Sequence, residues 1–383
     1  MTDATDLAPL DVSGRLDRLR ERFGSTGEDG RPIDALVVTT PANIRWLSGF
    51  SGSAGLLLVT ETGALLTTDG RYRTQSREQL AAAGVADDIT VCIGGLQVQR
   101  DAVVDRVTPA SAVGLEADSV SWTSLRTWQD LLAPRDLAPT RGLVENLRSV
   151  KDPAEVDRME RAASIADHAL GDVLGLLTAA GAGTGEPLSE SRFAAALDHA
   201  MRLRGAEESA FETIVASGEN SAKPHARPGD RLIGPGDPVV VDFGAVFDGY
   251  RSDMTRTFCV GGEPSGELAT VFAVVAESQR AGVRAVAPGV VAGSVDQACR
   301  EVIADSGWAD RFEHGTGHGV GLDIHEGPSV GPGSTAILGA GTVVTVEPGV
   351  YLPGTGGVRI EDTLVVTSNG SRPLTLFPKE VAV

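Results

Sequence analysis

The chain has 383 residues, 42% of them hydrophobic, which is enough for two domains or one large domain with a sizeable core. Its formal net charge of -19 at pH 7 would repel a nucleic-acid backbone, so we expect no nucleic-acid partner. The longest apolar run near the amino terminus, Leu56–Val59, is far shorter than a membrane span, so we expect no membrane partner.

The cysteines and the amino terminus bear on the compartment. Cys92, Cys259 and Cys299 are too few and too far apart for a disulfide framework or a zinc finger. The first residues, Met1–Asp6, are acidic and polar, whereas a secretory signal has a basic start followed by an apolar stretch. We therefore expect a cytoplasmic protein.

The first part of the chain mixes strand and helix patterns. The apolar segment 34–40 predicts a strand, and segments 55–60 and 63–68 predict a hairpin. Asp69-Gly70-Arg71-Tyr72 is expected to lead into a helix that runs to about Ala83, and a further short strand is expected at Val113–Glu116. This mixture is typical of an α/β domain.

A domain boundary is expected near residue 150, where Lys151-Asp152-Pro153 predicts the start of a helix. Asp152 can cap the helix, and Pro153 suits its first turn. We therefore assign residues 1–147 to a first domain and residues 148–383 to a second. Further helices are expected at 190–204, 265–286 and 294–306.

The stretch 239–258 predicts a hairpin that carries two aspartates. Its centre, Asp248-Gly249, is among the strongest short signals for a hairpin turn. With these two residues at the turn, Phe247 faces Tyr250, and the pairing of every other position follows.

In that register Asp242 faces Thr255 and Asp253 faces Gly244, which puts the two aspartates diagonally on one sheet face, roughly 7–8 Å apart at Cα. Two carboxylates aimed at one spot repel each other unless a cation lies between them, and Gly244 would leave space there. The alternative is a pair of solvated aspartates on an exposed face. The valines at 239–241, which lead into Asp242, favour burial.

Three of the six histidines fall within residues 312–326: His314, His318 and His325. The glycines at 315, 317, 319 and 321 make a continuous helix unfavourable, so this is not the helical two-histidine zinc motif. A glycine-rich segment instead lets the backbone pass close to a bound ion or ligand. The cluster therefore predicts a site, although a single histidine is usually structural.

A second pair of acidic residues lies near the carboxyl terminus. Glu347 ends the apolar strand 343–346 and precedes a Pro-Gly turn. In the next expected strand, 357–366, Arg359 and Glu361 share a face. The alternative for these two residues is a surface ion pair of little energetic weight.

Four carboxylates and one imidazole form an oxygen-rich set of metal-ligand candidates: Asp242, Asp253, His318, Glu347 and Glu361. Such a set suits hard or borderline divalent ions such as manganese better than a lone structural zinc. Two ions about 3.5–4 Å apart would hold and activate a water molecule between them.

These segments resemble the pita-bread metallopeptidases, which comprise aminopeptidase P, prolidase and methionine aminopeptidase, with creatinase as a metal-free relative. The resemblance lies in VVVDFGAVFDGYRSDMTRTF, HGTGHGVGLDIHE, TVEPGVYLPGTGGVRIED and IVASGENSAKPHA, and it covers most of residues 142–383. In the first half, NIRWLSGFSGSAGLLLV and DGRYRTQ resemble the non-catalytic domain of the proline-specific branch. The resemblance implies an α/β (α+β) chain in which a creatinase/prolidase-like domain precedes a pita-bread catalytic domain.

The resemblance also implies roles for the metal-ligand candidates. All five would hold two divalent ions, with Asp253 and Glu361 bridging them. Manganese is favoured, with cobalt and zinc as alternatives. Glu347 would in addition act as the general base for the bridging water.

Four further residues receive roles from the resemblance. His225 would contact the substrate and help to stabilise the tetrahedral intermediate, and His325 would bind the scissile carbonyl oxygen. His314 would line the pocket for proline, and Arg359 would orient a bridging carboxylate.

The implied reaction is removal of an amino-terminal residue that precedes proline, by an Xaa-Pro aminopeptidase. The first alternative is an Xaa-Pro dipeptidase (prolidase), which must also bind a free carboxylate. Many such dipeptidases carry an arginine where this chain has Ser329, which favours the aminopeptidase, although another loop could supply the charge. More distant alternatives are a creatinase-like hydrolase and a metal-free binding protein. The family likeness also suggests a homodimer or homotetramer.

Overall fold

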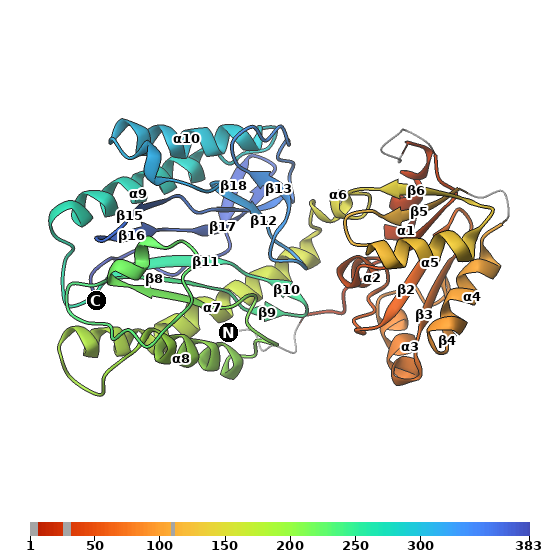
Figure 1. Ribbon diagram of the computed structural model, residues 1–383, viewed down its shortest axis with the longest axis horizontal. Coiled ribbons are helices and arrows are strands. Elements are labelled where there is room, and N and C mark those ends of the chain that lie inside the picture. Colours follow the sequence, from red (N-terminus) through yellow and green to blue (C-terminus); the bar gives the residue numbers. More distant parts are fainter. Residues whose placement is uncertain (1–6, 26–31, 109–111) are drawn as a thin grey trace. The chain divides into compact units, whose positions relative to one another are not determined.

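The computed structural model describes residues 7–25, 32–108 and 112–383 (Figure 1). The expectation that no secretory signal is present concerns residues 1–6, which lie outside these ranges. The chain divides into two compact units, Met1–Arg148 and Ser149–Val383. Among the helices in the described ranges, none has the length and apolar character needed to cross a bilayer.

The first unit is built on a six-stranded sheet in the order β4-β3-β2-β1-β5-β6. Strand β2 pairs antiparallel with both β1 and β3, and the remaining pairs are parallel. The predicted hairpin of residues 55–60 and 63–68 is confirmed as β2 and β3. The strands are β1 Ala35–Val38, β2 Gly55–Thr60, β3 Ala64–Thr68, β4 Ile89–Ile93, β5 Ala112–Glu116 and β6 Asp136–Thr140.

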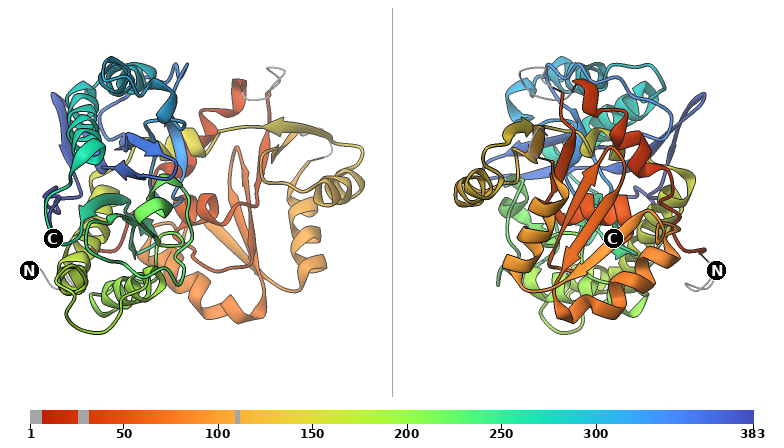
Figure 2. Two further views of the ribbon diagram at one scale, coloured as in Figure 1. Left: turned by 60° about the vertical axis from the view of Figure 1, so that its left-hand side comes forward. Right: turned by 90° about the vertical axis from the view of Figure 1, so that its right-hand side faces the viewer.

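Helices lie on both sides of this sheet (Figure 2). Alternate strand residues point to opposite faces, and every β1 residue is buried because both faces are covered. Ala35 and Val37 pack in one cluster with Val103 of α4 and Trp128 of α5. The helices are α1 Arg15–Arg20, α2 Pro41–Ser48, α3 Arg73–Ala82, α4 Leu96–Arg106, α5 Trp122–Leu132 and α6 Glu145–Arg148.

In the second unit, two pairs of helices enclose the strands (Figure 1). Helices α7 (Pro153–Gly181) and α8 (Glu190–Leu203) pack on one side, and α9 (Gly266–Ala285) and α10 (Ala292–Asp305) on the other. Each pair has its own hydrophobic cluster with the strands beneath it. The helices expected at 190–204, 265–286 and 294–306 are therefore confirmed to within about two residues at each end.

The first of these helices begins as its sequence predicts. The Asp152 carboxylate accepts the Glu155 N–H at 2.9 Å, and the Glu155 carboxylate accepts the Asp152 N–H at 2.9 Å, which completes a capping box. Pro153 occupies the first helical turn. The buried Val156 and Met159 continue the helix on its core side.

The predicted hairpin register is also confirmed. Tyr250 pairs with Phe247, and Thr255 pairs with Asp242. Both turn residues have positive φ, 44° at Asp248 and 73° at Gly249, as a two-residue hairpin turn requires. The strands are β8 Pro238–Phe243, β9 Val246–Phe247, β10 Tyr250–Arg251 and β11 Met254–Cys259, and β7 Ile214–Ser217 pairs with β8 on its other side.

Gly244 has a different role from the one predicted. A Cβ atom at this position would lie 1.9 Å from the carbonyl oxygen of Ser252. The glycine is therefore required by the close approach of the Ser252 backbone, and not by the side chain of Asp253.

The remaining strands form a five-stranded sheet, β13-β12-β14-β17-β18, and a hairpin of β15 and β16. They comprise β12 Gly317–Gly319, β13 Glu326–Val330, β14 Val343–Val346, β15 Gly349–Leu352, β16 Gly356–Arg359, β17 Asp362–Thr367 and β18 Gly370–Pro373. The single strand predicted at 357–366 is wrong, because β16 ends at Arg359 and β17 begins at Asp362.

The break at Glu361 has a physical cause. The Glu361 N–H donates to the carbonyl oxygen of Thr255 on β11 at 3.1 Å, so the chain leaves one strand pairing before it enters the next. This contact holds Glu361 beside the strand that faces Asp242.

Candidate metal centre and active site

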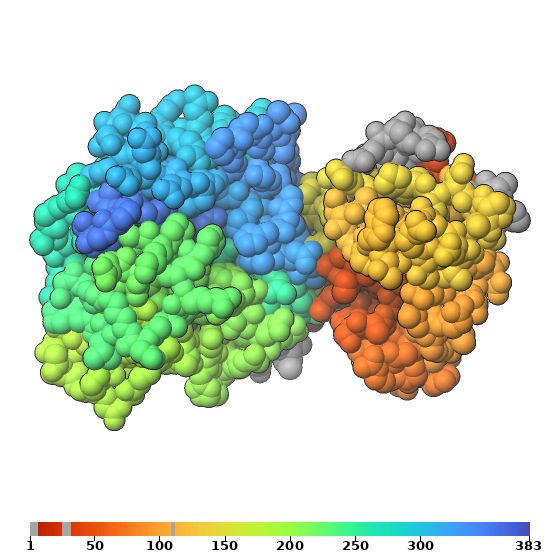
Figure 3. Space-filling view, in the orientation of Figure 1, coloured from red at the N-terminus to blue at the C-terminus, as the bar shows by residue number. Residues whose placement is uncertain are grey.

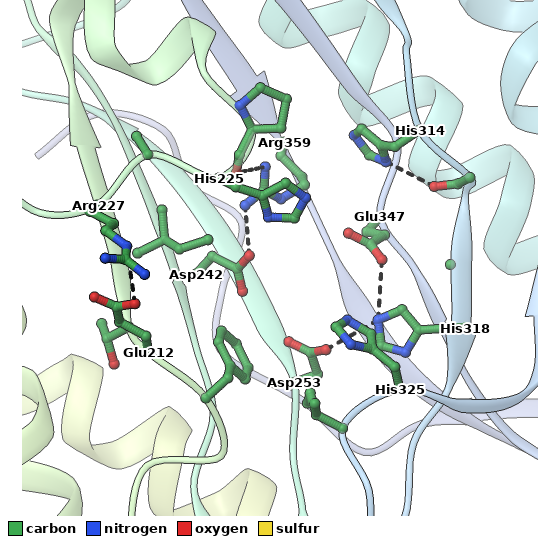
Figure 4. Close-up of a pocket in the computed structure, with 18 of the residues that line it drawn as sticks. Glu212, His225, Arg227, Asp242, Asp253, His314, His318, His325, Glu347 and Arg359 are labelled. Carbon is green, nitrogen blue, oxygen red and sulfur yellow. Dashed lines mark hydrogen bonds and ion pairs between the residues drawn. The ribbon is translucent and has the colours of Figure 1, made fainter. Parts of the chain in front are cut away.

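A cavity of about 650 Å³ in the second unit gathers the predicted site residues. Figure 4 shows their side chains converging on it from different strands and loops. On the surface, the green chain near residue 220 and the blue chain near residue 320 border each other (Figure 3). Glu361 does not line the cavity, which is lined by eight predicted residues: His225, Asp242, Asp253, His314, His318, His325, Glu347 and Arg359.

The predicted metal ligands are brought together. His318, on β12, has its Nε2 atom 3.5 Å from Asp253 Oδ2 and 3.4 Å from Glu347 Oε1. One ligand atom each from Asp253, His318 and Glu361 lies within 4.8 Å of the others. These separations let one ion contact several of the side chains.

Two carboxylate oxygens in this cluster support a metal site directly. Asp242 Oδ1 and Glu361 Oε1 are buried and have no hydrogen-bond partner within the described residues. Their sister oxygens are satisfied, since Arg359 Nη2 donates to Asp242 Oδ2 at 2.6 Å and Thr255 Oγ1 donates to Glu361 Oε2 at 2.7 Å. Leaving a buried acceptor unpaired is costly, and a divalent cation would remove that cost. The residues therefore fit a metal.

The electrostatics of the cluster lead to the same conclusion. Burial raises the pKa of Glu347 to about 8. Burial and the neighbouring carboxylates raise the pKa of Asp253 and of Glu361 well above their usual values. Without a cation, these side chains are stable in the fold chiefly as neutral acids.

His318 is suited to be the imidazole ligand. Burial lowers its pKa to about 4, so the ring is neutral near pH 7. Its Nδ1 lies 3.0 Å from the carbonyl oxygen of Gly319, and this acceptor places the proton on Nδ1. The lone pair on Nε2 then points toward Asp253 and Glu347.

Arg359 is buried, and its guanidinium pairs with Asp242. It does not pair directly with Asp253 or Glu361, the two carboxylates predicted to bridge the ions. Its Nε donates to Thr255 Oγ1 at 3.2 Å, and the Thr255 hydroxyl donates to Glu361. The arginine thus orients Asp242 directly and reaches Glu361 only through Thr255.

Tyr351 belongs to the site although no prediction named it. Its hydroxyl accepts from Arg359 Nη1 at 2.9 Å and lies 2.8 Å from His314 Nε2. His314 Nδ1 faces the carbonyl oxygen of Gly315 at 2.8 Å, so Nδ1 carries the proton and Nε2 accepts from Tyr351. Burial raises the pKa of Tyr351 to about 12, which keeps its proton available.

His225 and His325 are placed differently from the other histidines, because both are exposed while lining the cavity. The His325 ring lies edge-on to the His318 ring, with 4.4 Å between centroids. His225 follows the short helix η3 (Gly218–Ala222) and faces the cavity from the other side (Figure 4).

The mouth of the cavity carries a charge pair that was also not predicted. Arg227 Nε lies 3.4 Å from Glu212 Oε2, and the two side chains are 83% and 66% exposed. Both residues line the cavity, as does Ser329. The proximity of Arg227 to His225 in the sequence is the one signal that could have identified it.

Two families match the chain. Residues 15–150 match the creatinase/prolidase N-terminal domain, and residues 157–368 match metallopeptidase family M24. The chain belongs to metallopeptidase family M24. Its predicted resemblance and its predicted fold, an α/β amino-terminal part followed by a pita-bread part, are confirmed by these matches.

Several relatives are similar over nearly their whole length. A Bacillus subtilis protein called uncharacterized peptidase YqhT is 38% identical, with 96% of this chain and 99% of that protein aligned. The structure of an Xaa-Pro dipeptidase from Bacillus anthracis has a TM-score of 0.88 and 36% identity, covering 97% of this chain and 100% of the other. An X-Pro aminopeptidase structure from Thermotoga maritima has a TM-score of 0.83 and 33% identity, covering 96% and 99%.

The raised pKa of Glu347 predicts how the metal-free protein responds to pH. The folded state holds this proton up to about pH 8, above the ordinary value of 4.5. A raised carboxyl pKa stabilises the fold at low pH, and that stabilisation is lost as pH rises through the folded value. We therefore expect the Tm of the metal-free protein to fall between about pH 5 and pH 8.

The matched variant is Glu347→Gln, which keeps the size of the side chain and cannot ionise. Its Tm should fall less over the same pH range than that of the unchanged chain. Equal falls, measured by calorimetry after removal of metal, would show that Glu347 does not titrate in this way.

Proposed function

We propose that the chain is an Xaa-Pro aminopeptidase in which residues 148–383 are catalytic and residues 1–147 are not. Asp242, Asp253, His318, Glu347 and Glu361 would hold two divalent ions. The observation that carries the proposal is the pair of orphaned, buried oxygens of Asp242 and Glu361, next to a cavity lined by exposed histidines. The proline-specific relatives give the substrate class.

The ions, when bound, supply Lewis acidity and lower the pKa of water. Glu347 is the side chain best placed to move the proton. It lines the cavity, and its Oε1 atom lies 3.4 Å from His318 Nε2, among the other candidate ligands. It can therefore take a proton from the attacking water and give it to the leaving nitrogen of proline.

His225 and His325 would donate hydrogen bonds to the scissile carbonyl oxygen as negative charge develops on it. Both imidazoles are exposed in the cavity, so their ring nitrogens can reach a bound peptide. Hydrogen-bond donors aimed at the oxygen on which charge develops stabilise the transition state more than the bound substrate.

His314 would line the pocket for the proline ring through van der Waals contact and not through a hydrogen bond. Both of its nitrogens are engaged, by Gly315 and by Tyr351, so it offers no free donor to a substrate. Its ring contacts Phe312 edge-on at 5.1 Å between centroids and tilts against Tyr351 at 5.6 Å. These two contacts fix the His314 ring, which alone of the three lines the cavity and offers a flat face to the apolar pyrrolidine ring of proline.

Substrate length is the point on which a second function competes. Ser329 lines the cavity and offers no positive charge, which supports the aminopeptidase, whose peptide continues beyond proline. Arg227 at the mouth favours an Xaa-Pro dipeptidase, because a guanidinium can bind the free carboxylate of a dipeptide. Its present partner, Glu212, is exposed and would compete only weakly.

The finer features follow from the ligand set and the cysteines. Four carboxylates with one imidazole support manganese, with cobalt and zinc as alternatives. The three cysteines are free thiols, which suits the reducing cytoplasm. A homodimer or homotetramer is carried over from the family likeness alone.

The direct test is a panel of Xaa-Pro dipeptides and Xaa-Pro-Yaa tripeptides, assayed with manganese, cobalt and zinc in turn. We expect cleavage before proline, no cleavage when alanine replaces proline, and loss of activity on chelation. Glu347→Ala should lower kcat by about a thousandfold or more. Absence of cleavage of every Xaa-Pro substrate with every metal would refute the proposal.

The same panel decides the role of Arg227. If Arg227 binds the free carboxylate, Arg227→Ala should raise KM for dipeptides by about tenfold and leave tripeptides unchanged, since a charge-assisted hydrogen bond contributes about 1.5–3 kcal/mol. The KM of Arg227→Lys for dipeptides should lie between those of the unchanged chain and of Arg227→Ala. An equal change for both substrate lengths would remove the support that Arg227 gives to the dipeptidase.

The two cavity histidines have a distinct expected signature. His225→Ala and His325→Ala should keep their metal and their Tm but lose kcat, because each removes a donor worth about 2.7–4 kcal/mol in comparable sites. His168→Ala, on the exposed side of α7, is the matched control. Lowered Tm with an unchanged kcat per folded molecule would mean that these histidines only pack the loops.

A further inference from the structure

The second unit contains a buried ion pair that the proposed chemistry does not use. Lys151 Nζ lies 2.5 Å from Glu326 Oε1, and the two side chains are only 1% and 6% exposed. Lys151 stands just before α7, whereas Glu326 is the first residue of β13 and directly follows His325. The pair therefore joins the start of the unit to the turn that carries a cavity histidine.

Stability alone does not account for such a pair. Removing a lysine and a glutamate from water is expensive, and well-packed hydrophobic residues are often at least as stable. What the pair adds is a fixed distance and direction between two segments that are 175 positions apart in the chain.

The lysine end is rigidly anchored. The Lys151 N–H donates to the carbonyl oxygen of Gly341 at 2.8 Å. A Cβ atom on Gly341 would lie 2.6 Å from the Lys151 carbonyl oxygen, so the two backbones are in close contact. On its other side, the capping box of Asp152 and Glu155 fixes the chain as it enters α7.

The glutamate end reaches into the histidine turn. Glu326 pairs with Gly319, the residue after His318, across β12 and β13. Its carboxylate occupies the space beside Gly321, where a Cβ atom would lie 2.5 Å from Glu326 Oε1. The carboxylate that Lys151 holds is thus packed against the backbone of the turn of residues 320–325, at Gly321.

We propose that Lys151 is a positioning residue that acts through Glu326 to fix this turn and, with it, the direction of the His325 imidazole in the cavity. The catalytic consequence rests on the proposed function, in which His325 contacts the substrate. The geometric part concerns only the turn and can be measured without a substrate.

The geometric test uses the full-length chain, with and without diamagnetic zinc, and follows the six histidine rings by nuclear magnetic resonance. Lys151→Met removes the positive charge and keeps an unbranched side chain of similar length. It should shift the His325 signals and leave those of His168 and His199 in place. Arg158→Met is the matched control, because Arg158 Nε pairs with Asp248 Oδ2 at 2.6 Å, also with a buried side chain, but at the other turn.

The kinetic test asks whether the effect passes through His325. Lys151→Met should lower kcat by about 10–100-fold with little change in KM, and Lys151→Arg should recover part of the loss. In a His325→Ala background, Lys151→Met should cause almost no further loss, because the two changes act through one group.

Unmoved His325 signals, or the same kcat loss in both backgrounds, would overturn the proposal. If Lys151→Met does not fold, Glu326→Gln replaces it in both tests with the same expected outcomes. If the unchanged chain cleaves no Xaa-Pro substrate, the proposed function fails, and the resonance signals alone decide whether Lys151 positions His325.

Discussion

The site depends on one constraint, which is that several carboxylates are buried together with too little positive charge of their own. Two buried arginines lie beside them: the Arg359 guanidinium donates to Asp242, Tyr351 and Thr255, and Arg256 pairs with Asp362 and donates to the backbone carbonyl oxygen of Glu361. Asp242 and Glu361 each keep one oxygen with no partner among the described residues. Burying these carboxylates in ionised form costs free energy, and cations from outside the chain would offset that cost.

Within the second unit, two sets of strands, each backed by its own pair of helices, bring these groups together. The hairpin of β8 and β11 carries Asp242 and Asp253, and the sheet with β12 and β14 carries His318 and leads into Glu347. Glu361 is held between them by its backbone contact with Thr255. Each half packs on its own pair of helices, and the ligands lie on its strands (Asp242 and His318) or directly beside strand ends (Asp253, Glu347 and Glu361), while the exposed histidines lie on loops that a peptide can reach.

Features with a local cause could be predicted from the sequence. The Asp248-Gly249 turn determined the register of the hairpin and therefore the partner of Asp242, and the Asp152 capping box determined where α7 begins. Features that depend on distant partners could not. The break in the strand at Glu361 arises from a hydrogen bond to β11, and the role of Tyr351 arises from a ring 37 positions away. Gly244 is predicted only to leave space opposite Asp253, whereas the structure shows that the backbone of Ser252 requires a glycine there.

The central claim is that the buried carboxylates hold divalent ions, and counting those ions tests it most directly. Native mass spectrometry of the purified full-length chain, supplied with manganese, should show two ions per chain. Asp253→Asn should lose one or both ions while the protein stays folded, because this side chain lies within ligand distance of His318 and Glu361. A folded chain that takes up no more than trace metal, with cleavage unaffected by chelators, would contradict the account.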